Sequence, residues 1–152
     1  MEPSFHIEFA ASDDDYEWCA GVMASSEPWI TLGRDLEGCR EALARPGTEL
    51  FIARNQERPA GFILVAPVGL AGSPYIASIA VAAETRGQGI GSRLLHFAEE
   101  HFSAAGHLFL LVSSFNHRAQ HLYCQRGYEE VGELKDFVVP GHSELILHKR
   151  LS

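Results

Sequence analysis

The chain has 152 residues, the usual length of one domain, and we expect a single domain over residues 1–152 with one hydrophobic core. Hydrophobic residues make up 46% and charged residues 21%, which is typical of soluble globular proteins and excludes disordered and membrane-spanning classes. The net charge of −8 opposes binding to bare nucleic acid and mildly favours cationic partners.

Targeting and metal-binding patterns are absent from the sequence. The longest apolar stretches, such as 76–83, are too short to cross a bilayer, and no basic segment followed by an apolar one opens the chain. We therefore expect a cytoplasmic protein without membrane contact. His117 and His121 have a spacing that can bind zinc, but no third ligand lies nearby and the three cysteines are widely separated. We expect no metal, and the sequence leaves a homodimer open.

The amino-terminal half is predicted to contain one strand, two helices and a β-hairpin. Alternating apolar residues mark the first strand, and Ser12 before three aspartates is a helix N-cap pattern. The predicted elements are a strand over 5–9, a helix from Ser12 to about Ser25, a helix over Gly33–Ala44, and strands over Leu50–Arg54 and Gly61–Val68. Pro67 is expected to end the second strand of the hairpin.

The carboxyl-terminal half is predicted to alternate strands and helices. Its elements are strands over Tyr75–Val81, His107–Val112, Gly127–Leu134 and Glu144–Leu151, with a helix that runs from Gly91 to a C-cap at Gly106 and another over Asn116–Arg126. The almost wholly apolar run at 107–112 is typical of a parallel strand covered on both faces. The fold class is therefore α/β (α+β), a mixed sheet of about six to seven strands flanked by about four helices.

A glycine-rich turn joins the strand Tyr75–Val81 to the helix that follows it. First-turn amides of a helix have no intrahelical partner, and the helix dipole favours an anion there. The dinucleotide pattern G-x-G-x-x-G fails because its last position is Ser92, and the Walker pattern lacks Gly-Lys-Ser/Thr. The pattern Arg/Gln-x-x-Gly-x-Gly/Ala fits, with Arg86, Gly89 and Gly91 in place.

A second motif runs from Asn116 to Tyr128 and reads N-x-x-A-x-x-L-Y-x-x-x-G-Y. With these two motifs and the order of its predicted elements, the chain resembles the GNAT superfamily of acetyl-CoA-dependent N-acetyltransferases over nearly its whole length. Either motif alone is weak, whereas the pair is specific. The resemblance implies the GNAT fold, acetyl-CoA as the acyl donor and a primary amine of a small molecule or protein as the acceptor.

The resemblance also implies how acetyl-CoA is held. The donor is expected to lie along the backbone of one strand, on the glycine turn and against the start of the next helix. The residues implied are Ile79, Ala80 and Val81 for the pantetheine arm, Arg86, Gly87, Gln88, Gly89, Ile90, Gly91 and Ser92 for the pyrophosphate, and Asn116 and Tyr123 near the thioester. Asn116 is also a candidate N-cap, a role compatible with cofactor contact.

Tyr123 occupies the position of the family's usual general acid. A tyrosine hydroxyl has a pKa of about 10 against about 8.5 for a thiol, so it stays protonated at neutral pH and can protonate the departing thiolate. The alternative is a structural tyrosine, because Tyr123 lies beside Ala119 and Leu122 at helical spacing.

The general base has no obvious candidate. The family's ribosomal-protein alanine acetyltransferases carry a Glu five residues before the Asn, where this chain has Leu111, and the strand Tyr75–Val81 contains no carboxylate. Glu27 is the best remaining candidate because the loop between the first two helices usually borders the acceptor site in this superfamily. Trp29 is expected to line the acceptor pocket. A solvated Glu27 and a Trp29 that only packs on the core remain alternatives.

Three functions stay open at this point. The first is transfer of acetyl from acetyl-CoA to a primary amine by direct attack. The second is a non-catalytic acyl-CoA-binding module, which the missing base keeps open. The third is the same transferase with a longer acyl donor.

Overall fold

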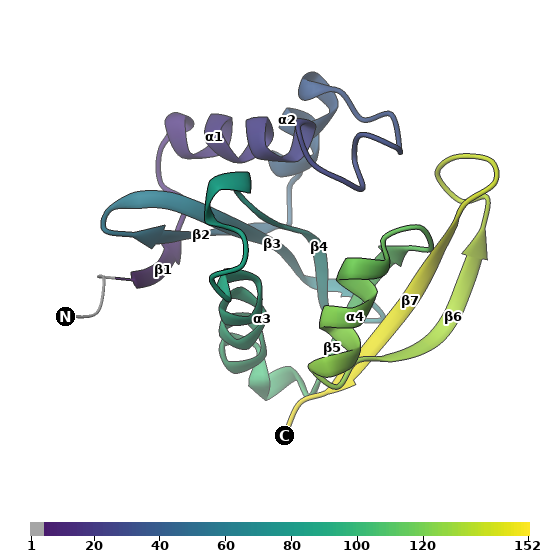
Figure 1. The fold of residues 1–152 in the computed structure, drawn as a ribbon. Coiled ribbons are helices and arrows are strands. Elements are labelled where there is room, and N and C mark those ends of the chain that lie inside the picture. The colour runs from purple at the N-terminus through teal and green to yellow at the C-terminus, as the bar shows by residue number, and fades with distance from the viewer. Residues whose placement is uncertain (1–4) are drawn as a thin grey trace.

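The computed structural model describes residues 5–152, which form one seven-stranded sheet in the order β1-β2-β3-β4-β5-β7-β6 (Figure 1). The strands are β1 (Phe5–Phe9), β2 (Glu49–Asn55), β3 (Arg58–Leu70), β4 (Ser73–Val81), β5 (His107–Ser113), β6 (Glu129–Lys135) and β7 (Ser143–Arg150). The helices are α1 (Asp13–Ala24), α2 (Leu36–Leu43), α3 (Ile90–His101) and α4 (His117–Gln125), with short 3-10 turns at Ala83–Thr85 and Ser103–Ala105. Within residues 5–152 no helix has the length and apolarity needed to span a membrane.

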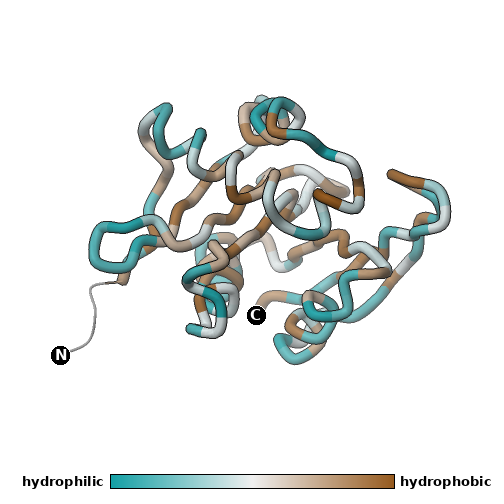
Figure 2. Tube along the Cα trace, turned by 45° about the horizontal axis from the view of Figure 1, so that its top comes forward, coloured by the Kyte–Doolittle hydropathy of each residue, from teal (hydrophilic) through white to brown (hydrophobic). Residues whose placement is uncertain are grey.

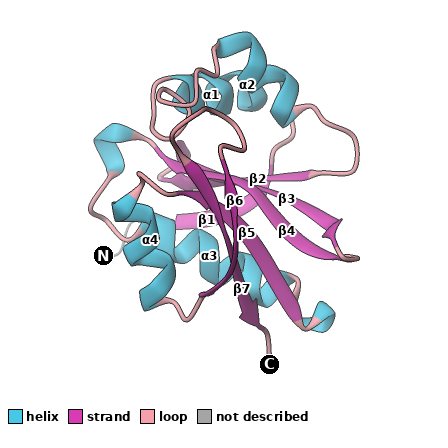
Figure 3. Cartoon of the chain, turned by 90° about the vertical axis from the view of Figure 1, so that its right-hand side faces the viewer, coloured by secondary structure: helices cyan, strands magenta, loops and turns pink. Residues whose placement is uncertain are grey.

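The sheet is mixed, as predicted. Strands β4 and β5 pair in parallel, and all other neighbours pair antiparallel. The β6–β7 hairpin adds to β5 through β7, so the carboxyl-terminal strands stand beside the meander β1–β4 and at an angle to it (Figure 3). The predicted fold class, a mixed sheet of six to seven strands with four helices, is confirmed.

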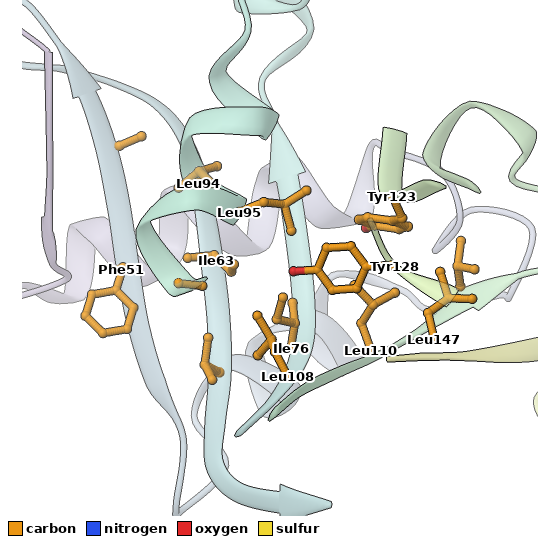
Figure 4. Packing of buried hydrophobic residues seen from close by; sticks show 14 of the residues in the cluster. Phe51, Ile63, Ile76, Leu94, Leu95, Leu108, Leu110, Tyr123, Tyr128 and Leu147 are labelled. Atoms are coloured by element: carbon orange, nitrogen blue, oxygen red, sulfur yellow. The ribbon is translucent and has the colours of Figure 1, made fainter. Parts of the chain in front are cut away.

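Alternation along the strands divides the core between the two faces of the sheet. In β2, Leu50 and Ile52 pack against α1 and α2, while Phe51 and Ala53 point to the opposite face and pack against α3. The hydrophobic segments lie mainly in the interior of the molecule, and the loops are largely hydrophilic (Figure 2). The larger cluster, on the α3 and α4 face, includes Leu94, Leu95 and Tyr123 (Figure 4).

Two predicted boundaries, the end of β3 and the start of α2, were wrong. Strand β3 passes through Pro67 to Leu70, because the chain bulges between Ala66 and Leu70 and the strand then turns directly into β4. Helix α2 begins at Leu36 and not at Gly33, because the Asp35 carboxylate caps it by accepting the Gly38 N–H at 2.8 Å.

The expectation of a fully buried, parallel β5 was also only partly right. Its residues alternate between buried and half-buried, since β5 is parallel to β4 on one edge and antiparallel to β7 on the other. The long helix after the glycine turn ends at His101 and continues as a 3-10 turn, after which Gly106 adopts a left-handed conformation with φ of 81°. Gly106 is thus the C-cap of the 3-10 turn, and the prediction that it caps the long helix was wrong, because that helix has its C-cap at Phe102.

Candidate active site

The turn between β4 and α3 exposes the amides of a helix start. Gly89 is the N-cap of α3 and has a left-handed backbone, with φ of 77° and ψ of 13°. Gly87 has φ of 81°, and a Cβ built on either glycine would meet no described atom within 4 Å. No side chain of residues 5–152 caps α3, and its first turn carries no acidic residue. The amides here are therefore free to bind an anion.

Hydrogen bonds hold this turn against the sheet. The Thr85 hydroxyl donates to the Ala60 carbonyl at 3.0 Å. Arg86 Nε donates to the Val81 carbonyl and Arg86 Nη2 to the Ser26 hydroxyl, both at 3.3 Å. The turn is thus fixed from the sheet side, and its glycines remain exposed.

Strands β4 and β5 pair at one end only. In the described sheet their pairs are Tyr75 with Phe109 and Ile76 with Leu110. Beyond these pairs, residues 78–81 of β4 stay bonded to β3, while β5 continues beside β7 as far as Ser113. The edge of β4 that faces β5 is therefore open to a further extended chain.

A cavity of about 580 Å³ reaches this opening. Its walls are the α1–α2 loop, β4, β5, the start of α4 and the β6–β7 loop. The polar and aromatic side chains that line it include Glu27, Trp29, Tyr75, Ser78, Ser113, Asn116, Tyr123, Phe137 and Glu144. The cavity thus brings together four side chains singled out from the sequence, Glu27, Trp29, Asn116 and Tyr123, and Ile79 of β4. The turn residues 86–92 lie outside it, at the start of α3.

The model of the Acetyltransferase (GNAT) family matches residues 9–128, which contain the glycine turn and the segment 116–127. The chain belongs to the GNAT acetyltransferase family. A search of curated proteins finds no match to the sequence.

Solved GNAT structures share the fold. A protein of Desulfovibrio desulfuricans assigned to the GNAT acetyltransferases is 18% identical, with a TM-score of 0.84 over 98% of this chain and 100% of the other. An aminoglycoside 6'-N-acetyltransferase in complex with coenzyme A is 15% identical, with a TM-score of 0.76 over 97% of each chain. Nourseothricin acetyltransferase is 29% identical, with a TM-score of 0.64 over 70% of this chain and 67% of its own. The GNAT fold expected from the resemblance is confirmed.

Tyr123 lies in α4 with its side chain in the core and at the cavity. It is 6% exposed, and its ring lies edge to face against Tyr128 with centroids 5.9 Å apart (Figure 4). Within residues 5–152 its hydroxyl has no hydrogen-bond partner. Burial raises the pKa of Tyr123 above its usual value of about 10. The hydroxyl is therefore protonated at neutral pH and free to donate.

Asn116 fixes the start of the helix that carries Tyr123. Its Oδ1 accepts the Ala119 N–H at 3.3 Å, so its predicted role as N-cap is confirmed. Gln120 Nε2 donates to the carbonyls of Ser113 and Ser114 at 3.1 and 3.0 Å, which ties the loop between β5 and α4 to the helix. Asn116 is held rigidly at the wall of the cavity.

Glu27 and Trp29 both lie at the cavity, in the loop after α1. The exposed carboxylate of Glu27 accepts hydrogen bonds from Thr31, at 3.0 Å from the N–H and 2.8 Å from the hydroxyl. Trp29 is 6% exposed and packs in the cluster beneath α1 and α2, so it lines the pocket and belongs to the core at once.

Sequence reasoning missed a buried carboxylate in this cavity. Glu144, in β7, is 7% exposed and accepts a hydrogen bond of 2.7 Å from the Ser113 hydroxyl. Glu144 is paired with Ser113 and Ile146 with Leu111, so all four side chains share one face of the sheet. Glu144 therefore lies on the same face as Leu111. Its signal was a charged residue directly before the short apolar run 145–147.

The histidines and cysteines do not form a metal site in the described part of the chain. No group of three His, Cys, Asp or Glu side chains is suitably placed within residues 5–152. Cys19 and Cys39 are buried free thiols, and Cys124 is an exposed one.

Proposed function

We propose that this GNAT enzyme transfers the acetyl group of acetyl-CoA to a primary amine of a small molecule or a protein, by direct attack. The observation that carries the proposal is one cavity that contains both the unpartnered hydroxyl of Tyr123 and the open edge of β4. A candidate general acid and a binding edge for an extended donor thus border the same cavity. The complex of a structural neighbour with coenzyme A supports the choice of donor.

The donor fits the groups that the chain offers. The uncapped amides from Gly87 to Ser92 suit a pyrophosphate, because the left-handed glycines leave open space in front of them. The backbone of Ile79–Val81 lies along the open edge of β4, where it can pair with the amides of a pantetheine arm, and Arg86 Nε already donates to the Val81 carbonyl there. Arg86 adds a positive charge beside the turn, and Asn116 lies where it can contact the donor near the thioester.

The reaction requires two proton transfers, and neutral groups can donate and accept these protons. The amine nitrogen attacks the carbonyl carbon, a C–N bond forms, the C–S bond breaks and the sulfur leaves as a thiolate. Tyr123 gives its proton to the thiolate and regains one from the nitrogen that has been acylated. An ammonium acceptor must lose a further proton before it attacks, and that proton goes to a base or to water, so one proton is released per turnover.

The acceptor enters from the side of the α1–α2 loop. We assign Glu27 as the candidate base at this entrance, directly or through water, and Trp29 as an apolar wall for the acceptor. Both side chains line the cavity, and the two hydrogen bonds from Thr31 hold the Glu27 carboxylate in one place.

Release of the coenzyme A thiol in the presence of a panel of amines tests the proposal. We expect release that depends on an amine and is matched by acetylated product. Binding of acetyl-CoA without release with any amine would support a non-catalytic acyl-CoA-binding module. Faster thiol release from longer acyl-CoA donors would support the same transferase activity with a longer acyl donor in place of acetyl-CoA.

A further inference from the structure

The acceptor side of the cavity contains a buried negative charge. Glu144 has no salt bridge to any Lys, Arg or His of residues 5–152, and its described polar partner is the neutral hydroxyl of Ser113. The other buried glutamate, Glu99, is by contrast paired with Arg126 and Lys149. A carboxylate buried without a cation is costly, and a ligand ammonium would compensate it.

The outer part of the same cavity has the opposite charge. Arg34 and Arg45, before and after α2, both line it, and neither guanidinium forms an ion pair with a described residue. The net charge of the chain is −8, so two arginines without an ion-pair partner give this part of the cavity a charge opposite to that of the whole protein. They suit an anionic group of a ligand.

Tyr75 of β4 lines the same cavity as the three charged groups. Burial raises the pKa of its hydroxyl, the charge of Glu144 raises it further, and the charges of Arg34 and Arg45 lower it. All three charged groups therefore lie close enough to act on one hydroxyl in the cavity wall. The lining of the cavity thus combines one buried carboxylate, that of Glu144, with two exposed guanidinium groups, those of Arg34 and Arg45.

We propose that the acceptor is a small zwitterionic amine of the amino acid class, whose ammonium is received by Glu144 and whose carboxylate is received by Arg34 and Arg45. The inference rests on the proposed function and adds the substrate class. The acceptor is thereby oriented, with its amine at the buried Glu144 and its carboxylate at the exposed arginines. After the amine has lost its proton, Glu144 still accepts a hydrogen bond from the neutral nitrogen.

Matched acceptors test the inference with the intact protein and acetyl-CoA. We would compare amino acids of increasing chain length with the corresponding carboxamides, and measure thiol release for each. Replacing the carboxylate by a carboxamide does not make the amine more basic, so the acid does not have the larger fraction of neutral amine. A preference for the acid therefore reports recognition of its carboxylate. We expect kcat/KM to be about 10- to 100-fold higher for the acid of the best pair.

Three variants and a control locate the effect. Arg34→Gln and Arg45→Gln should raise the KM of the acid about 10-fold or more and leave the KM of the carboxamide unchanged. Glu144→Gln keeps an acceptor for Ser113 but should raise the KM of both amines while acetyl-CoA affinity stays the same. Arg58→Gln, at an exposed arginine that begins β3, is the matched control and should change neither.

The outcomes separate this inference from the function on which it rests. The inference is overturned if thiol release is equal or faster with carboxamides, or if it is unaffected in Arg34→Gln and Arg45→Gln. The proposed acetyltransferase activity would stand in either case. No release with any acid, carboxamide or other amine overturns both. A higher KM for the acid in the control variant as well would show a general charge effect and would also overturn it.

Discussion

Tyr123 and Tyr128 lie edge to face, with ring centroids 5.9 Å apart, yet their hydroxyl groups have different surroundings. The Tyr128 hydroxyl donates to the buried Glu99 at 3.0 Å, in a network that also contains Arg126 and Lys149. The Tyr123 hydroxyl has no partner among the described residues. The geometry therefore separates a tyrosine that joins α3 to the carboxyl-terminal strands from one that is free to act on a ligand.

Tyr128→Phe tests the structural half of this pair. Removal of the hydroxyl takes one hydrogen bond from a buried carboxylate, and we expect a loss of about 1–2 kcal/mol in the free energy of unfolding. Thermal or denaturant unfolding measures this loss. The kcat for an accepted amine should stay within about twofold of the wild type, since the hydroxyl of Tyr128 is bound to Glu99. A normal stability with a large fall in kcat would reverse the assignment of the two tyrosines.

Gly89→Glu tests the pyrophosphate site. The side chain would place bulk and negative charge in front of the α3 amides, so we expect the rise in melting temperature caused by acetyl-CoA to disappear. Gly72→Glu is the matched control, because Gly72 is also left-handed, with φ of 72°, and open to solvent in the β3–β4 turn. The control should lose similar intrinsic stability and keep the full shift with acetyl-CoA. An undiminished shift in Gly89→Glu would rule out this site.

Glu27→Gln tests the candidate base. The amide keeps an acceptor for the Thr31 N–H, so the loop should hold its conformation. If Glu27 removes the amine proton, kcat/KM should fall about 10²-fold near neutral pH and recover as rising pH deprotonates the amine in solution. Glu100→Gln, an exposed glutamate of α3, serves as the control. A pH profile of Glu27→Gln that coincides with the wild type would leave water or Glu144 to accept the proton.

Asp15 gives the fold a defined dependence on pH. Burial raises the pKa of Asp15, but hydrogen bonds from the Ala11 N–H and from Arg54, at 3.1 and 2.7 Å, together lower it below 3.8. A carboxyl whose pKa is lower in the folded state stabilises the protein above about pH 3.8, and the contribution is lost as the pH falls through the folded value.

Asp15→Asn should therefore lower the free energy of unfolding by about 1–2 kcal/mol at pH 7, and the difference from the wild type should close in acid. Denaturant unfolding at several pH values measures it. Asp14→Asn, at an exposed position in the same helix turn, should cost at most about 0.5 kcal/mol. A difference that persists unchanged below pH 3 would exclude ionisation of Asp15 as its cause.

The local parts of the fold were predictable because the signals are local. The cap at Ser12 and the glycine turn at 86–91 each depend on a few adjacent residues, and both are present as expected. The passage of β3 through Pro67 was not predictable, since the bulge depends on pairing with β4. The partial pairing of β4 with β5 likewise depends on residues far apart in the sequence, such as Ile76 and Leu110, and no local pattern fixes their register.

The candidate site divides in the same way. The donor turn and Tyr123 lie in continuous motifs and could be singled out from the sequence alone. Glu144 could not be singled out, because its place in the cavity depends on the register of β5 and β7. That register pairs it with Ser113 and puts it on the same face of the sheet as Leu111. Arg34 and Arg45 flank α2 and meet at the cavity only when the helix is docked on the sheet.

The most direct test of the account is kcat for Tyr123→Phe, measured together with acetyl-CoA affinity and melting temperature. In the proposed mechanism the hydroxyl acts only as the C–S bond breaks, and it has no hydrogen-bond partner in residues 5–152. The account therefore predicts kcat lower by about 10²- to 10⁴-fold with affinity and stability nearly unchanged. A normal kcat with an accepted amine, or a loss explained entirely by a lower melting temperature, would contradict it.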